Sequence, residues 1–173
     1  MVVNRGKQFE DVIKQAFLNV PDVSVDRLHD QMSGYFGSKN ICDFIVYKKP
    51  YEYYIECKSV HRNILSIHSI PKLGKDGKLH GFHGNITDTQ WDGLIEKSKI
   101  QGVRAGIICW WIDLDKTYYI PMWVLEDAYK NGYKSINLNY PYCQGYWIPI
   151  DGKKKRVFFD YDMTEFFRRM EKR

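Results

Sequence analysis

The feature that most restricts the fold of this chain is an almost uninterrupted apolar run at residues 105–112, AGIICWWI. A strand with one solvent-exposed face alternates apolar and polar residues, whereas a continuously apolar strand is buried on both faces. We therefore expect this run to be a central strand with other elements packed on each side. Trp110 and Trp111 should point to opposite faces and belong to the core.

The remaining sequence provides helices and strands in the mixture typical of an α/β domain. A helix capped by Asn4 and running to about Asn19 is predicted from apolar positions at helical spacing: Phe9, Val12, Ile13, Ala16 and Phe17. Further strands are expected at 23–28, 41–47, 51–58, 117–121 and 156–160, and further helices at 87–101, 121–130 and after Asp162. This order predicts one domain, 1–173, with a mixed central β-sheet flanked by helices.

Composition excludes several classes of protein. With 173 residues, 44% of them apolar, the chain is long enough for one core and is neither disordered, collagen-like nor a coiled coil. It has 26 Lys and Arg against 21 Asp and Glu, and the net charge of +5 permits a polyanionic partner without requiring one.

Targeting signals and cysteine spacing bear on the compartment. No secretion signal or membrane-length apolar run is visible, and the four cysteines form no C-x-x-C pair. We expect a cytoplasmic protein without a membrane partner, a disulfide framework or structural zinc.

The two strands expected at 41–47 and 51–58 place acidic residues close together. If their turn is symmetric about Lys49 and Pro50, Asp43 lies opposite Glu56. Side chains alternate along a strand, so Asp43, Glu56 and Lys58 then share one face. The other face is apolar and is expected to join the core; it comprises Cys42, Phe44, Val46, Tyr53, Ile55 and Cys57. A turn one residue longer would instead put the two carboxylates on opposite faces.

Two carboxylates in this arrangement favour a bound cation. Directly opposed residues have Cβ atoms roughly 4.5–5.5 Å apart, where like charges destabilise a sheet. A hard divalent ion such as Mg²⁺ takes oxygen ligands, and Lys58 could orient a water or balance charge on a phosphate. The alternative is an ordinary solvated strand, because scattered Asp, Glu and Lys are common in strands.

The spacing of these residues resembles a known nuclease signature. Asp43 followed by Glu56-Cys57-Lys58 is similar to the D…(D/E)-x-K motif of the PD-(D/E)XK superfamily, which has a restriction-endonuclease-like core. The segment 4–10 (NRGKQFE) resembles the N-R-G-x-x-x-E opening of RecU-type Holliday-junction resolvases. The segments 106–112, 118–128 and 131–136 also resemble the sequence that follows the active site in that family.

The resemblance implies a homodimeric endonuclease that uses Mg²⁺, or Mn²⁺ in its place, to cut branched DNA symmetrically. It implies that Asp43, Glu56, the backbone carbonyl of Cys57 and Glu10 hold the metal, with Lys58 as the catalytic lysine. Gln90 resembles the family's glutamine after the active-site strands. Two alternatives stay open: that Gln90 is only the partner of Thr87 in a capping box, and that Glu10 is an ordinary first-turn acid.

The chain departs from the family at two places, of which only the second bears on the substrate. Residue 42 is Cys instead of Pro, at a loosely kept position, and the connection 29–40 is shorter than the family's insertion that enters the junction. A restriction- or repair-type endonuclease on duplex DNA, and a DNA-binding module without catalysis, therefore remain alternatives.

Basic residues suggest where DNA would lie. The segment 59–86 reads as a long, mobile, DNA-contacting loop with four histidines, whose rival readings are a solvated loop and a zinc site at His80 and His83. Arg5 and Lys7 oppose the helix dipole, which makes phosphate contact a better reason for them than stability. The expected DNA-binding residues are Arg5, Lys7, Lys39, Arg62, Lys72, Lys75 and Lys78.

Overall fold

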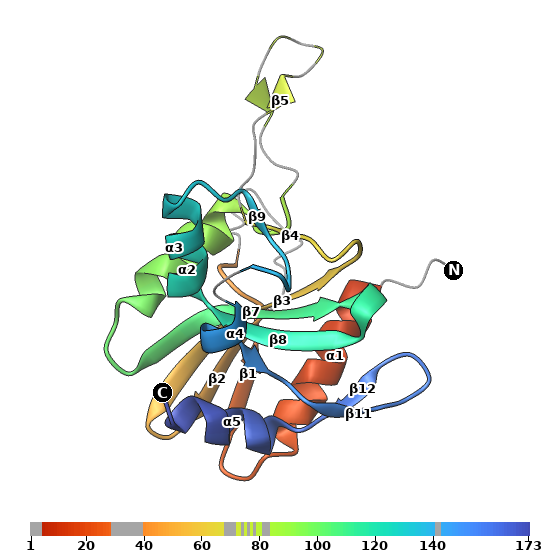
Figure 1. Ribbon diagram of the computed structural model, residues 1–173. Helices are drawn as coiled ribbons and strands as arrows, with labels where there is room; N and C mark the ends of the chain where they lie inside the picture. The colour runs from red at the N-terminus through yellow and green to blue at the C-terminus, as the bar shows by residue number, and fades with distance from the viewer. Residues whose placement is uncertain are drawn as a thin grey trace, which may run out of the picture.

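The protein is described from a computed structural model, which covers residues 5–28, 40–67, 72, 73, 75, 77, 79, 80, 84–140 and 143–173. Its centre is a six-stranded sheet in the order β1-β2-β3-β7-β8-β10 (Figure 1). Strands β3 and β7 are parallel and the other neighbours are antiparallel, so the sheet is mixed as expected. The strands of this sheet are β1 Ser24–Arg27, β2 Phe44–Lys48, β3 Tyr51–Val60, β7 Val103–Trp111, β8 Lys116–Pro121 and β10 Ile148–Pro149.

Helices cover both faces of this sheet. One buried cluster packs α1 (Arg5–Leu18) and α5 (Met163–Glu171) against one face, and a second cluster packs α2 (Asp88–Ser98) and α3 (Met122–Lys130) against the other. The α/β class with a mixed sheet flanked by helices is thereby confirmed. Shorter elements complete the chain: the pairs β4 (Leu65–Ser66) with β9 (Ser135–Ile136), β5 (Lys72–Leu73) with β6 (Leu79–His80) and β11 (Gly152–Lys154) with β12 (Phe159–Tyr161), the helix α4 (Cys143–Tyr146) and a 3-10 turn (Ile112–Leu114).

The apolar run is the central strand that the sequence predicts. Strand β7 has β3 on one side and β8 on the other. Trp110 lies in the cluster of α1 and α5 and Trp111 in the cluster of α2 and α3, and both are buried. A tryptophan on each face lets one strand contribute to both cores.

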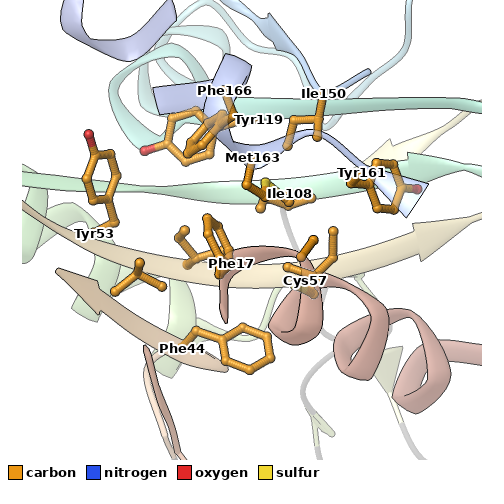
Figure 2. Packing of buried hydrophobic residues seen from close by; sticks show 14 of the residues in the cluster. Phe17, Phe44, Tyr53, Cys57, Ile108, Tyr119, Ile150, Tyr161, Met163 and Phe166 are labelled. Carbon is orange, nitrogen blue, oxygen red and sulfur yellow. The ribbon is translucent and has the colours of Figure 1, made fainter. Parts of the chain in front are cut away.

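The first helix also forms as predicted. Phe9, Ile13, Ala16 and Phe17 are buried on one face of α1, and the Phe9 ring lies 5.7 Å from the ring of Trp110, centroid to centroid. Figure 2 shows Phe17 of α1 and Phe166 of α5 packed against the side chains of this sheet face. The proposed cap, Asn4, lies outside the described residues.

The register of the hairpin β2–β3 agrees with the symmetric turn. Phe44 pairs with Ile55 and Lys48 with Tyr51, so Asp43 and Glu56 are the next positions beyond the last ladder pair. One expectation for this hairpin is wrong. Cys42 does not join Phe44 on the α1 face but packs in the cluster of α2 and α3, because the regular alternation of β2 begins only at Phe44.

Other boundaries shift by a few residues. Helix α2 ends at Ser98 rather than near 101, and the last strand is Phe159–Tyr161 rather than 156–160, because it pairs with β11 after a turn. The segment 59–86 begins as the end of β3 and contains β4, β5 and β6. The sequence predicts that this segment is mobile. Its residues 68–71, 74, 76, 78 and 81–83 lie outside the described part of the chain. Among the described residues, no helix is long and apolar enough to cross a membrane.

Candidate active site

The site forms where β2 begins and β3 continues past it. The Asp43 N–H donates to the carbonyl of Ile55 at 3.0 Å, and its carboxylate Oδ2 accepts the N–H of Cys57 at 2.7 Å. These two bonds fix Asp43 beside the main chain that carries Glu56. The side chain of Cys57 points into the core with α1, so only the main chain of Cys57 borders the site.

Glu56 is one of the few buried charged residues of the described chain, with 2% of its surface exposed. Its Oε1 accepts hydrogen bonds from Lys58 Nζ at 2.5 Å and from Gln90 Nε2 at 2.7 Å. Its Oε2 is buried and has no hydrogen-bond partner in the described part of the protein. A buried carboxylate oxygen without a donor is costly, which marks this atom as a place for a ligand.

Burial controls the protonation of this carboxylate. Desolvation, together with the negative charges of Asp43 and Glu10, raises the pKa of Glu56 to about 8 against the lowering effect of Lys58. Mutual repulsion of carboxylates is a sign that they lie close together. Perturbed acids of this kind occur often at functional sites.

Gln90 forms the predicted capping box and also contacts two strand residues of the motif. Its backbone N–H and side chain complete the capping box of α2 with Thr87, and its side-chain Oε1 accepts the N–H of Thr87 at 3.1 Å. The same Oε1 lies 3.3 Å from Lys58 Nζ, while Nε2 donates to Glu56. The side-chain amide of Gln90, at the start of α2, therefore contacts both Glu56 and Lys58 of β3.

Glu10 approaches the site from the opposite face through α1. Burial and the charge of Asp43 raise the pKa of Glu10, and Arg27 lowers it. The Arg27 guanidinium donates to Glu10 Oε2 at 2.5 Å and to Asp11 Oδ1 at 2.6 Å. No pattern in the sequence indicated Arg27, because the pair joins a helix to a strand across 17 positions.

The donors fit a metal ion in part. Asp43 and Glu56 are adjacent carboxylates, and the partnerless Oε2 of Glu56 suits a hard cation. Among the described residues, however, no group of three or more His, Cys, Asp or Glu is arranged to hold a metal. The Glu10 carboxylate forms an ion pair with Arg27, so it would reach a metal here only through water or by leaving that pair.

Four of the seven expected DNA-binding residues are described as exposed, and they belong to different parts of the chain. Arg5, Lys7, Arg62 and Lys75 are exposed, Lys72 lies in β5, and Lys39 and Lys78 lie outside the described residues. A groove of about 800 Å³ between α1 and the hairpin β11–β12 brings Arg5 together with Lys155 and Arg156. This grouping joins residues that are far apart in sequence.

The end of β3 has a further contact that sequence patterns did not indicate. His61 Nδ1 lies 2.8 Å from Asp113 Oδ1, and Asp113 Oδ2 accepts the N–H of Arg62 at 2.7 Å. Arg62 and Asn63 both have positive φ angles, 58° and 56°, which are uncommon outside glycine. Asp113 thus fixes a tight turn directly after the strand that carries Glu56 and Lys58.

The sequence also predicts cysteines without a disulfide framework and leaves a zinc pair at His80 and His83 as an alternative. Cys42, Cys57 and Cys109 are free and buried, and burial raises the pKa of each thiol. Of the proposed zinc pair, His80 lies in β6 and His83 is outside the described residues.

Neither a scan against models of known protein families nor a search of curated proteins finds a match to this chain.

Proposed function

We propose that this protein is a metal-dependent DNA endonuclease that hydrolyses phosphodiester bonds in branched DNA as a homodimer. The observation that carries the proposal is the arrangement around Glu56: a buried carboxylate beside Asp43, with one oxygen bound to Lys58 and Gln90 and the other without a partner. This arrangement and the resemblance to the RecU-type pattern point to the same four residues.

The two strand carboxylates, Asp43 and Glu56, would hold Mg²⁺ or Mn²⁺, together with the backbone carbonyl of Cys57 and with Glu10 directly or through water. Such an ion lowers the pKa of a bound water and polarises a phosphate oxygen. The raised pKa of Glu56 means that a proton leaves its carboxyl when a cation arrives, since ligands bind metals in their deprotonated form.

Lys58 and Gln90 would provide the remaining chemistry. The Lys58 ammonium is held at Glu56 Oε1 and near Gln90 Oε1, so its position is fixed before substrate arrives. A positioned cation stabilises negative charge that develops on a phosphate in the transition state. The exposed basic residues Arg5, Lys7 and Arg62 would contact the DNA backbone, which gives affinity without sequence selection.

Cleavage of a four-way junction tests this function. The protein with Mg²⁺ should nick two strands of the junction at symmetric positions, whereas Asp43→Asn and added EDTA should abolish cutting. Asp26→Asn is the matched control, because Asp26 is an exposed acid on neighbouring β1 and the charge change is the same. Its activity should equal that of the parent.

Two other results would replace the proposal. Equal cutting of a junction and of its linear duplex arms would indicate a restriction- or repair-type endonuclease. DNA binding without cleavage by the parent protein, across Mg²⁺ and Mn²⁺, would indicate a binding module on the same fold.

A further inference from the structure

A cavity of about 450 Å³ lies at the start of β7, at the far end of this strand from the candidate active site. Lys58 of the site pairs with Cys109 of β7, and Arg104 of the cavity is five positions earlier in the same strand. With a rise of about 3.3 Å per residue, the two places are roughly 16 Å apart along the strand. The cavity is therefore separate from the carboxylates.

The sheet is incomplete at this point. The ladder between β7 and β8 ends at Gly106 and Pro121, where the chain turns into α3. Among the described strands, residues 103–105 of β7 therefore pair only with β3. The space where β8 would have continued is the cavity, and its volume is within the range of small-ligand sites.

Two arginines give this cavity its charge. Arg104 and Arg173 line it, and the described lining residues include no Asp or Glu. The Arg104 guanidinium carbon lies 4.4 Å from the centroid of the Tyr51 ring, a cation–π contact that does not use the N–H donors in a hydrogen bond. Arg173 uses Nη1 to donate to the Gly145 carbonyl at 2.6 Å and keeps its other donors. In the described part of the protein neither arginine forms an ion pair with a carboxylate, so both can bind an anion.

Two aromatic side chains border the same cavity. Trp123 of α3 and Tyr146 of α4 are 48% and 45% exposed, and their ring centroids are 4.9 Å apart at an interplanar angle of 77°. Exposed aromatic rings beside cations are typical of surfaces on which nucleobases stack. An inorganic anion alone would leave these rings unused, and an apolar ligand would leave both guanidinium groups unpaired.

We propose that this cavity binds a single nucleotide, with its base against Trp123 and Tyr146 and its phosphate between Arg104 and Arg173. The ligand class is a nucleoside 5′-phosphate, free or as one unpaired residue of a DNA strand. The site goes beyond the proposed nuclease function and needs neither the metal nor the carboxylates. Binding can thus be measured whether or not the protein cuts DNA.

The test uses the full chain without metal, titrated with each of the four deoxynucleoside 5′-monophosphates. The chain has five tryptophans, so a proton–nitrogen NMR spectrum contains five side-chain indole signals, and Trp123→Phe identifies the one from Trp123. We expect saturable movement of the Trp123 signal with at least one monophosphate. Inorganic phosphate and the matching deoxynucleoside should each bind at least about tenfold more weakly, since each lacks half of the contacts.

Variants locate the site. Trp123→Ala and Arg173→Gln should each weaken binding by about fivefold or more, as expected for loss of a stacking surface or a charged donor. Because Trp123→Ala lacks the Trp123 indole, its affinity is measured from the backbone amide signals that shift in the parent. Lys49→Gln removes an exposed cation from the β2–β3 turn and should have no effect. Asp43→Asn should bind nucleotide as the parent does, which separates this site from the nuclease proposal.

Three results would overturn the inference. They are the absence of saturable binding by any monophosphate, equal affinity for inorganic phosphate or for the nucleoside, and unchanged affinity in both Trp123→Ala and Arg173→Gln. Circular dichroism of each variant shows that its fold is retained, and Arg104→Gln is a further variant if one of them does not fold.

Discussion

At the scale of single residues, the site is built around an acid that opposes folding. Glu56 is buried, its Oε2 has no partner among the described residues, and its pKa is raised to about 8. Natural proteins keep such groups where activity requires them, at some cost in stability. The same residue should therefore affect stability and activity in opposite directions.

Glu56→Gln tests this opposition in metal-free protein. In the parent, the Glu56 carboxyl keeps its proton to a higher pH in the folded state than in the unfolded chain. The free energy of unfolding of the parent should therefore fall as pH rises from about 4.5 to about 8. Gln lacks this titration. The free energy of unfolding of the variant, relative to that of the parent, should be about 1–3 kcal/mol higher at pH 9 than at pH 5. The variant should also be inactive in cleavage. Thermal unfolding in EDTA at both pH values measures this, and an equal difference at the two values would contradict it.

Gln90 can be separated into its structural and chemical roles by a pair of variants. Thr87→Ala and Gln90→Ala both break the capping box of α2 and should each cost about 0.5–2 kcal/mol of stability. Only Gln90→Ala also removes the contacts to Glu56 and Lys58. We expect its kcat for junction cleavage to fall about 10- to 100-fold, against about twofold or less for Thr87→Ala. Similar losses of kcat in both variants would mean that Gln90 acts only as part of the capping box.

At the scale of secondary-structure elements, close packing around β7 leaves little room for added atoms. A Cβ added to Gly106 would lie 2.5 Å from the Tyr119 ring and 2.6 Å from the Ile120 carbonyl oxygen. The Tyr119 ring is buried, and the carbonyl belongs to the main chain of the paired strand β8. Glycine at this position is therefore a requirement of the pairing between two strands.

Gly106→Ala should destabilise the protein by about 1–3 kcal/mol, the usual cost of overpacking. Gly145→Ala is the matched control, because a Cβ there meets no atom within 4 Å, and its effect should stay within about 0.5 kcal/mol. Urea unfolding of both variants measures the difference. Equal stabilities would mean that β7 and β8 can move apart without cost.

The elements that the sequence predicted are those with local signals. The capping box at Thr87 and the symmetric turn at Lys49 and Pro50 are encoded within a few residues, and both formed as expected. The two-residue strands β9 and β10 were missed, because they carry no periodic pattern and exist only through pairing with distant partners.

The candidate site was predictable to the same extent. Alternation along β2 and β3 brought Asp43, Glu56 and Lys58 together, but it could not show that Arg27 binds Glu10. It also failed at Cys42, where β2 has not yet begun its regular pairing. Contacts between elements depend on packing, which a pattern within one element does not contain.

At the scale of the whole molecule, the net charge of +5 is less informative than its distribution. Asp43 and Glu56 lie together beside the start of β2. The groove between α1 and the hairpin β11–β12 is bordered by three basic residues, Arg5, Lys155 and Arg156, and by two acids, Asp11 and Asp160. A DNA backbone lying along this groove would release counterions from each phosphate that is neutralised.

Salt dependence of DNA binding measures these contacts. Arg5→Gln and Arg156→Gln should each weaken binding to any sequence and reduce the slope of log affinity against log salt by about 1. Lys49→Gln, at the turn of the β2–β3 hairpin, should leave the slope unchanged. An unchanged slope in both arginine variants would place the DNA elsewhere on the protein.

The parallel pairing of β3 with β7 also bears on how the chain acquires its structure. The hairpin β2–β3 closes through a two-residue turn, but β3 meets β7 only across roughly fifty intervening residues. Pairing over such a distance is a slow step, because the loop must close before its contacts form. Until β7 and α2 arrive, Glu56 can remain hydrated, so the energetic penalty of its burial falls late in folding. A chain still emerging from the ribosome would be spared that penalty until most of the sheet had been synthesised.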